Sequence, residues 1–336
     1  MLARLIDALR RLLRIFGFGT PAQRDDSPQP EPRLAQPAPE PAPVDPAAAP
    51  PVQPALALFQ LVATSGEVPM RAGDDPAGFT LGMIQSFAGT GAAFGAPAAD
   101  GRMVPVATNQ PLMAVFGFSF GGDGMHLGLP NLTGRTPVGG AQPGMFGPQT
   151  LTLTYLIATE AGSGAPLLGM IAAFGGNYAP PGWMPASGQM LPISANVPLY
   201  QLIGQTYGGN PVGFTLPDLD GFAAIGAGAA PGLPAVALGG RVATPVPAIG
   251  LNYLICVTGA APPAGGTGAF PQSEGFLGQV IAYAGPEAPD GWMLCDGSLL
   301  DAGLYPALFA VIGTRFGSSG QNFALPDLRG RILTGF

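Results

Sequence analysis

Gly278–Gly330 has the sequence GQVIAYAGPEAPDGWMLCDGSLLDAGLYPALFAVIGTRFGSSGQNFALPDLRG, and this stretch occurs three times in the chain. Gly82–Gly134 and Gly169–Gly221 are the other two copies, and all three align without a gap. A stretch that recurs at one fixed length indicates a folding unit that is repeated along the chain. We therefore expect three tandem repeats rather than one large domain.

Glycines and a Leu-Pro-(Asp/Asn)-Leu turn recur at matching offsets in the three copies. Because glycine tolerates positive φ and close backbone approach, we expect these glycines to set turns rather than to pack side chains. The turn closes each copy, and tryptophan precedes it in the second and third copies. The repeat signature comprises Gly82, Gly101, Pro130, Gly134, Gly169, Trp183, Gly188, Pro217, Asp218, Gly221, Gly278, Trp292, Gly297, Pro326, Asp327, Gly330 and Arg331.

The composition combines many turn residues with enough apolar residues for a core. Of the 336 residues, 53 are glycine and 40 are proline, yet 47% are hydrophobic. Small, turn-rich and mostly β units joined by linkers satisfy both observations. The net charge of −7 argues against a nucleic-acid binder, which needs a basic surface. Two cysteines, Cys256 and Cys295, are too few for a disulfide framework, and either a pair or two buried thiols remain open.

Residues 1–18 are predicted to form an amphipathic helix, with a 3-4-3-4 spacing of apolar residues opposite a basic face. Three interpretations are open: a short coiled coil that trimerises the chain, an element that docks into a larger assembly, and a helix on a membrane surface. Charged residues such as Arg4 and Asp7 interrupt the apolar stretch, so we expect no signal peptide. The apolar face of this anchor helix comprises Leu2, Leu5, Leu9, Leu12 and Phe16.

Residues 19–54 are predicted to be a disordered spacer. Twelve prolines fall between Pro21 and Pro54. Such a segment cannot bury a core and favours polyproline II. Extended, it spans on the order of 100 Å. We therefore expect it to hold the anchor helix away from the repeats.

A strand is predicted before each copy of the repeat. Residues 56–64, 151–159 and 249–257 align with one another, and apolar and polar residues partly alternate in them. Each repeat is therefore expected to be α+β and mostly β, beginning with this strand and containing one short helix. The domains are placed at 55–150, 151–248 and 249–336.

The interior of the repeat shows where its helix and its variable segments lie. Residues 198–204 and 305–313 have helical spacing of apolar side chains and end at a glycine, where a helix stops. The uncharged stretch 222–240 is expected to be a loop. Loops 136–150 and 222–248 differ most among the repeats, so we expect them to carry specificity.

The number of predicted strands suggests how the repeats fit together. One strand precedes the first repeat, and none is expected between the third repeat and Phe336. If strand 56–64 completes the third repeat, the chain closes a pseudo-threefold ring in which one polypeptide imitates a homotrimer. A closed ring has no exposed sheet edge. The competing arrangements place each strand on the repeat that follows it, or exchange strands between three chains.

The third repeat resembles the phage tail collar domain. The resemblance rests on GWMLCDG at 291–297, YPALFAVIG at 305–313 and FALPDLRGR at 323–331. It is strong in the third repeat, good in the second and weaker in the first. In the first repeat Ala96 stands where the other two have tryptophan, and Asn131 replaces the aspartate of the turn.

This resemblance implies a non-enzymatic structural component of a phage tail fibre or a tail-derived particle. Such a protein is often trimeric. It would contact other tail proteins through the N-terminal helix, and a host-surface glycan or protein through the repeats. The alternative is a self-assembling bacterial surface or secreted fibre that the basic helix anchors. The resemblance implies no catalytic residue, cofactor or metal.

Three kinds of residue are candidates for a site of chemistry, and each has a simpler interpretation. His126 is the only histidine, and three copies around an axis would bind zinc, but a loop histidine is the simpler interpretation. Asp218 and Asp327 follow a proline in a turn, where an aspartate satisfies backbone N–H groups or pairs with a nearby arginine. Trp183 and Trp292 would suit sugar stacking, yet a tryptophan at the start of a strand more often fills a core.

Overall fold

The described part of the chain forms one compact unit. The predicted anchor helix 1–18 and nearly all of the spacer 19–54 lie outside the described residues, and so does the apolar face of that helix. The computed structural model describes residues 54–63, 81–89, 96–140, 146–160, 166–261 and 275–336.

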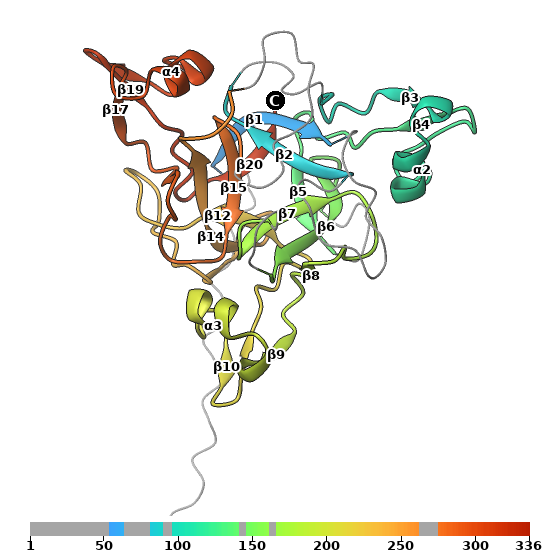
Figure 1. Ribbon diagram of the computed structural model, residues 1–336, viewed down its shortest axis with the longest axis horizontal. Coiled ribbons are helices and arrows are strands. Elements are labelled where there is room, and N and C mark those ends of the chain that lie inside the picture. Colours follow the sequence, from blue (N-terminus) through green and yellow to red (C-terminus); the bar gives the residue numbers. More distant parts are fainter. Residues whose placement is uncertain (1–53, 64–80, 90–95, 141–145, 161–165, 262–274) are drawn as a thin grey trace, which may run out of the picture. The chain divides into compact units, whose positions relative to one another are not determined.

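Each repeat contains a similar succession of short strands and one helix (Figure 1). Three long strands precede the repeats, namely β1 (Ala55–Val62), β6 (Thr150–Ala158) and β14 (Ala248–Cys256). The first repeat has β2 (Met83–Phe87), β3 (Met103–Pro105), the 3-10 turn η1 (Val106–Thr108), α2 (Gln110–Phe116), β4 (His126–Gly128) and β5 (Thr136–Gly139). The second has β7 (Met170–Phe174), β8 (Trp183–Pro185), β9 (Met190–Pro192), η2 (Ile193–Ala195), α3 (Val197–Ile203), β10 (Gly209–Asn210), β11 (Gly213–Thr215), β12 (Ala223–Gly226) and β13 (Arg241–Val242). The third has β15 (Gln279–Tyr283), β16 (Trp292–Leu294), β17 (Leu299–Asp301), α4 (Pro306–Ile312), β18 (Ser318–Ser319), β19 (Asn322–Ala324) and β20 (Ile332–Gly335).

The short helices α2, α3 and α4 confirm the helical spacing that the sequence shows. Each has a proline in its first turn, where a missing N–H costs no intrahelical hydrogen bond. Each ends at a glycine with positive φ, as a helix stop requires. These glycines are Gly117 (φ 56°), Gly204 (φ 54°) and Gly313 (φ 55°).

Strands β2, β7 and β15 form a closed triangle of antiparallel pairs. The beginning of each strand pairs with the end of the strand from the next repeat, and the third repeat pairs with the first. Because this order returns to its start after three steps, it defines a pseudo-threefold axis. The opposing residues are Met83 and Phe174, Met170 and Tyr283, and Gln279 and Phe87.

Each long strand belongs to two repeats. Its first half pairs in parallel with the strand that follows the Leu-Pro-(Asp/Asn)-Leu turn of the repeat before it, and its second half pairs antiparallel with the first strand of the repeat after it. Thus β6 joins β5 to β7, and β14 joins β12 to β15. The first strand of the chain follows the same rule, since β1 joins β20 to β2.

The pairing of β1 with β20 closes the ring. Ala55 lies opposite Ile332, and Leu58 lies opposite Gly335. The hypothesis that strand 56–64 completes the third repeat is therefore confirmed. The competing arrangement, in which each strand belongs to the repeat that follows it, describes only half of the pairing. The ring forms within one chain, so it requires no strand from a second copy.

Two stretches that were expected to be loops contain strands. Residues 222–240 contain β12, and residues 136–150 contain β5, so those two predictions are wrong. A strand of four residues is too short to show a hydrophobic period, and β20 was missed for the same reason. A glycine at the end of each strand was the available signal, since Gly139, Gly226 and Gly335 recur at one offset.

These terminal glycines let the backbones of neighbouring repeats touch. The N–H of Gly226 donates to the Arg331 carbonyl at 3.0 Å, and equivalent bonds join the other two pairs of repeats. A Cβ atom on Gly226 would overlap the carbonyl oxygen of Leu328. The same overlap would occur between Gly139 and Leu219, and between Gly335 and Leu132. Only glycine therefore fits at this offset.

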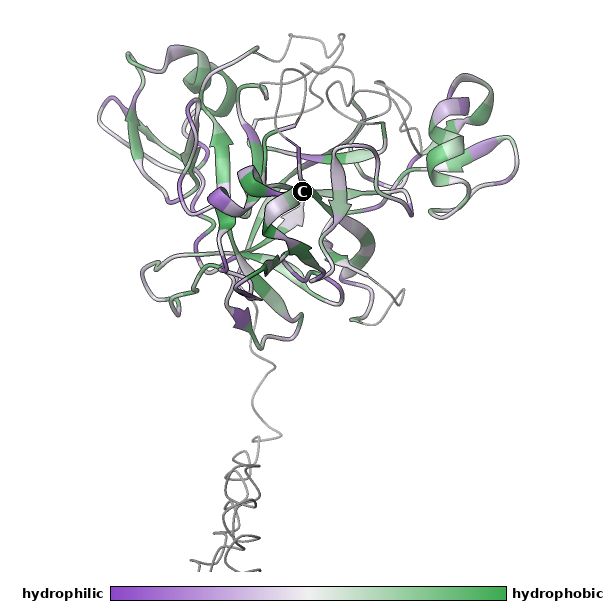
Figure 2. Cartoon of the chain, turned by 60° about the horizontal axis from the view of Figure 1, so that its bottom comes forward, coloured by the Kyte–Doolittle hydropathy of each residue, from purple (hydrophilic) through white to green (hydrophobic). Residues whose placement is uncertain are grey.

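The hydrophobic core continues from the axis into the junctions between repeats, and Figure 2 shows hydrophobic residues along the central strands. Phe174 of the second repeat reaches helix α2 of the first, where a Cβ on Gly82 would meet both Phe116 and Phe174. In the same way, Tyr283 of the third repeat reaches α3 of the second, and Phe87 of the first repeat reaches α4 of the third. The signature glycines Gly82, Gly169 and Gly278 thus make room for an aromatic ring from the following repeat.

Replacing Gly226 by alanine is expected to destabilise the ring by about 2 kcal/mol or more, because the new Cβ forces two repeats apart. Gly303→Ala is the matched control. A Cβ there meets only the flexible Asp301 carboxylate, 3.0 Å away, and the backbone φ is not positive. Urea unfolding of both variants measures the difference. Equal free energies of unfolding would show that the contact between Gly226 and Leu328 is not a constraint.

Removing the closing strand is expected to open the ring. A chain that lacks residues 1–63 leaves one side of β2 and one side of β20 without a partner, and such edges promote aggregation. A chain that lacks only residues 1–49 keeps β1 and is the control. Sedimentation velocity and thermal unfolding distinguish the two chains. The closure would be unimportant if the longer deletion stayed monodisperse and melted at the same temperature as the control.

Candidate functional site

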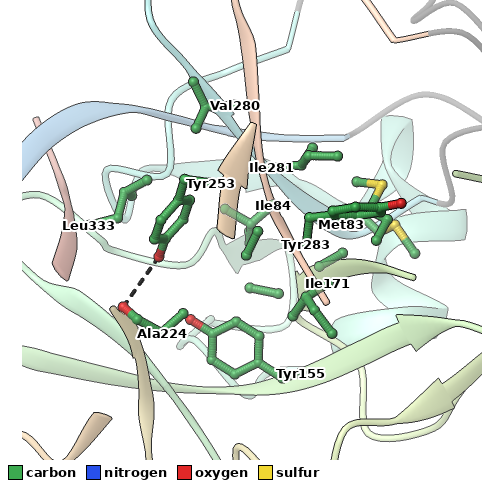
Figure 3. Packing of buried hydrophobic residues seen from close by; sticks show 14 of the residues in the cluster. Met83, Ile84, Tyr155, Ile171, Ala224, Tyr253, Val280, Ile281, Tyr283 and Leu333 are labelled. Carbon is green, nitrogen blue, oxygen red and sulfur yellow. Dashed lines mark hydrogen bonds between the residues drawn. The ribbon is translucent and has the colours of Figure 1, made fainter. Parts of the chain in front are cut away.

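Tyr155 of β6 and Tyr253 of β14 lie close to the pseudo-threefold axis (Figure 3), and Gln60 of β1 lines the same cavity there. Tyr155 and Tyr253 occupy equivalent positions and are buried. The hydroxyl of Tyr155 donates to the Pro137 carbonyl and that of Tyr253 to the Ala224 carbonyl, each at 3.2 Å. Since Pro137 and Ala224 are themselves equivalent, the two bonds tie a long strand to the terminal strand of the preceding repeat.

The third sector of the axis is polar, because Gln60 stands where the others have tyrosine. Its Oε1 accepts a hydrogen bond from Ser86 Oγ at 3.0 Å, and nearby Gln85 accepts one from Gln279 Nε2 at 2.7 Å. Gln60 and Gln85 are 4% and 1% exposed, and neither Nε2 has a partner among the described residues. Both residues line a cavity of about 40 Å³. The axis is therefore not symmetric in chemistry, although it is symmetric in backbone.

The carboxylates of the Leu-Pro-Asp-Leu turns are held by arginine. Asp327 accepts hydrogen bonds from the backbone N–H and from Nε of Arg329, at 3.2 and 3.0 Å, and pairs with Arg331 at 3.4 Å. Burial opposes ionisation of Asp327, but these hydrogen bonds and charges outweigh it and lower the pKa of the carboxyl group. Asp218 pairs with Arg241 at 2.7 Å. The expected structural pairing of Asp327 is confirmed.

The tryptophans differ in burial. Trp183 is 5% exposed and lies in the core, as expected. Trp292 is half-buried and packs beside Gly275. Neither is an open platform for a sugar ring. Cys256 and Cys295 are both buried and form no disulfide. Burial raises the pKa of the Cys256 thiol to about 11.

His126 begins strand β4, so the prediction that it lies in a loop is wrong. The carboxylate of Asp123 accepts the backbone N–H groups of Met125 and His126 at 3.0 and 2.7 Å, and this turn directs the chain into the strand. The imidazole Nδ1 lies 3.2 Å from the same carboxylate. In the part of the chain that the structure describes, no three histidine, cysteine or acidic side chains gather as metal ligands.

Two clefts occupy equivalent places between neighbouring repeats. The cleft between the first and second repeats, called cleft 1–2, has a volume of about 550 Å³. It lies along β6, and Asp220 and Ser187 line it. The cleft between the second and third repeats, called cleft 2–3, has a volume of about 270 Å³ and is lined at the same offsets by Arg329 and Asp296.

An aromatic pair takes the third equivalent place, between the third and first repeats. The backbone N–H of Phe336 donates to the Leu58 carbonyl. The backbone N–H groups of Gly140 and Ala227 make the equivalent hydrogen bonds at the other two junctions. The ring of Phe336 lies against that of Phe59, with centroids 5.1 Å apart. The three junctions thus share a backbone but present different side chains.

Comparison with known proteins agrees with the threefold repetition. The sequence profile of the phage tail collar domain matches the chain three times, at residues 82–137, 169–223 and 278–333. A stretch of 50 residues is 48% identical to the protein RhiB of Rhizobium leguminosarum bv. viciae. That match covers 14% of this chain and 23% of RhiB, so the chain spans less than a quarter of that relative. No solved structure matches the chain. None of the helices in the described residues is long and apolar enough to cross a membrane.

The ring is expected to lose stability in alkaline solution. Burial raises the pKa of Tyr155 and Tyr253, and that of Tyr207, above the value of about 10 that tyrosine has in an unfolded chain. Above that value the unfolded chain releases protons that the folded chain retains, so the free energy of unfolding falls. The contribution of these tyrosines to it is constant below about pH 9 and falls above about pH 10, by up to roughly 1.4 kcal/mol per pH unit for each tyrosine.

Urea unfolding at a series of pH values measures this dependence, and Tyr253→Phe is the informative variant. It removes one ionising group, so its alkaline slope should be shallower by one proton. It should also be less stable at neutral pH, because the Ala224 carbonyl loses its donor. A free energy that stayed level to about pH 11 would show that these phenols do not resist ionisation in the fold.

Proposed function

The chain belongs to the phage tail collar domain family and carries three tandem copies of the domain, and from this we propose that it is a non-enzymatic structural component of a phage tail fibre or tail-derived particle. Its role is to present the collar ring as a head for assembly or for attachment to a host surface. The single observation that carries this proposal is that all three collar copies join in one closed ring.

A structural role agrees with how the acidic side chains are used. The carboxylates of Asp218 and Asp327 would be the first candidates for acid–base chemistry, since they recur in the turn that closes the second and third repeats. Both are paired with arginine, at 2.7 Å from Arg241 and 3.0 Å from Arg329. Such pairing fixes the turn in place. It also engages both carboxylates with a cation rather than leaving them open to a substrate.

The proposed assembly separates the head from its anchor. The head is a ring of one chain, because β1 supplies the strand that a neighbouring copy supplies in a homotrimer. The basic helix predicted at 1–18 then docks with other tail proteins or joins copies of the chain, and the proline-rich spacer sets its distance from the head. The protein resides on the particle, and its ring faces outward to a host glycan or protein.

Co-purification with particles tests this function. Tail-like particles from the native source should contain the full chain, and a chain with Leu5→Glu and Leu9→Glu in the predicted anchor helix should be lost from them. Thermal unfolding of that variant should be unchanged, because the substitutions lie outside the ring. Absence of the protein from particles, or full retention of the variant, would contradict the proposal.

The mass of the protein in solution tests whether the ring is monomeric and the N-terminal helix is the part that associates. Residues 50–336 should be monomeric by light scattering, because the ring needs no second chain. Any self-association of the full chain should disappear with the same two substitutions in the helix. A trimeric 50–336 fragment would show that the heads themselves associate.

A further inference from the structure

We propose that cleft 1–2 is a binding site for a neutral saccharide. This inference deepens the attachment role and rests on the proposed function. It starts from the three equivalent junctions, which share one backbone and differ in what they present to solvent.

The first step is the opening of cleft 1–2. At the offset that Phe336 holds at the junction between the third and first repeats, where its ring lies against Phe59, the first repeat has Gly140. This glycine has φ of +88°, and a Cβ on it would lie 3.0 Å from Cα of Asp220. A side chain is therefore excluded at residue 140, and Asp220 can line the cleft at the same spot.

The second step is the charge of the cleft. Asp220 is the only ionisable acidic or basic side chain among the residues that line it, whereas Arg329 holds the same offset in cleft 2–3. Neighbouring Asp218 is already paired with Arg241, but Asp220 has no ion-pair partner among the described residues. With a carboxylate and no cation, cleft 1–2 repels anionic ligands.

The third step is the hydrogen-bonding capacity around that carboxylate. Thr152, on β6, and the exposed Asn177 and Ser119 also line the cleft, and they make no side-chain hydrogen bond among the described residues. The half-buried ring of Phe120 adds an apolar surface. Carboxylate, amide and hydroxyl groups beside an aromatic ring suit the hydroxyl groups and the C–H face of a sugar. The volume of about 550 Å³ is also within the range of small-molecule sites.

Sequence divergence points to the same place. Gly140 and Thr150 come from segment 136–150, which differs strongly among the repeats, and both line cleft 1–2. Segment 222–248 likewise contributes Ala227 and Ala229 to cleft 2–3. The backbone contacts that fix the ring are shared by the repeats, but the polar side chains that line the two clefts differ, since Asp220 and Ser187 of cleft 1–2 correspond to Arg329 and Asp296 of cleft 2–3. This is the distribution expected where a scaffold carries a recognition site.

Ligand-observed NMR with the full chain tests the inference. The probes are the methyl glycosides of glucose, galactose and mannose, with glucuronic acid as an anionic probe and glucosamine as a cationic one. At least one neutral glycoside should bind with a dissociation constant in the range of about 1–10 mM, and glucuronic acid should not bind. Asp220→Asn and Thr152→Val should each weaken binding by roughly tenfold, because the first replaces one acceptor oxygen by an NH2 donor and the second removes a hydroxyl group, both with little change in shape.

Thr133→Ala is the matched control, since residue 133 holds the offset of Asp220 at the junction where Phe336 lies. It should leave binding unchanged. The inference is overturned if no neutral glycoside binds, if binding survives both cleft substitutions, or if only glucosamine binds, which would make the cleft a cation site. In each of these cases the protein would still co-purify with particles, so failure here is distinct from failure of the proposed function.

Discussion

The pairing of β1 with β20 is the interaction on which the rest of the ring depends. Every long strand holds two repeats together, but β6 and β14 lie between repeats that the chain already connects. Of the three long strands, only β1 joins parts of the molecule that are far apart in sequence, since Ala55 meets Ile332. Without it, β2 and β20 would become open edges of the central sheet, and the triangle around the axis would lose one of its outer supports.

The closed ring also explains why glycine is so frequent. Three backbones converge on one axis. Because they approach one another so closely, side chains fit between them only at certain offsets of the repeat. Gly226 touches the turn of the next repeat, and Gly82 makes room for Phe174 of the next repeat. Other glycines are required for their backbone conformation rather than for space. Gly204, for example, ends a helix with positive φ. The composition that resembles a disordered chain therefore results from close packing of three small units.

Much of this fold could be predicted from the sequence, because threefold repetition exposes constraints that one copy would hide. The helices at 198–204 and 305–313, the long strands and the closing role of strand 56–64 all follow from alignment of the copies. The terminal strands β5, β12 and β20 could not be found by periodicity, since four buried residues show no alternation. The clefts were equally hidden, because Asp220 and Gly140 come together only when two repeats meet. Sequence divergence in 136–150 and 222–248 indicated where to look, but not which side chains would face each other.

Joining three repeats in one chain removes a restriction that a homotrimer cannot escape. In a trimer of identical chains, any residue at a junction appears three times, so all clefts must be alike. Here the same offset holds Asp220, Arg329 and Thr133, and the same backbone position holds Gly140, Ala227 and Phe336. Even the axis has diverged, because Gln60 replaces a tyrosine while the strands around it keep their pairing. The glycines that bring the backbones together cannot vary in this way, since a single Cβ would separate the repeats. A single-chain ring can therefore offer chemically different junctions on one scaffold.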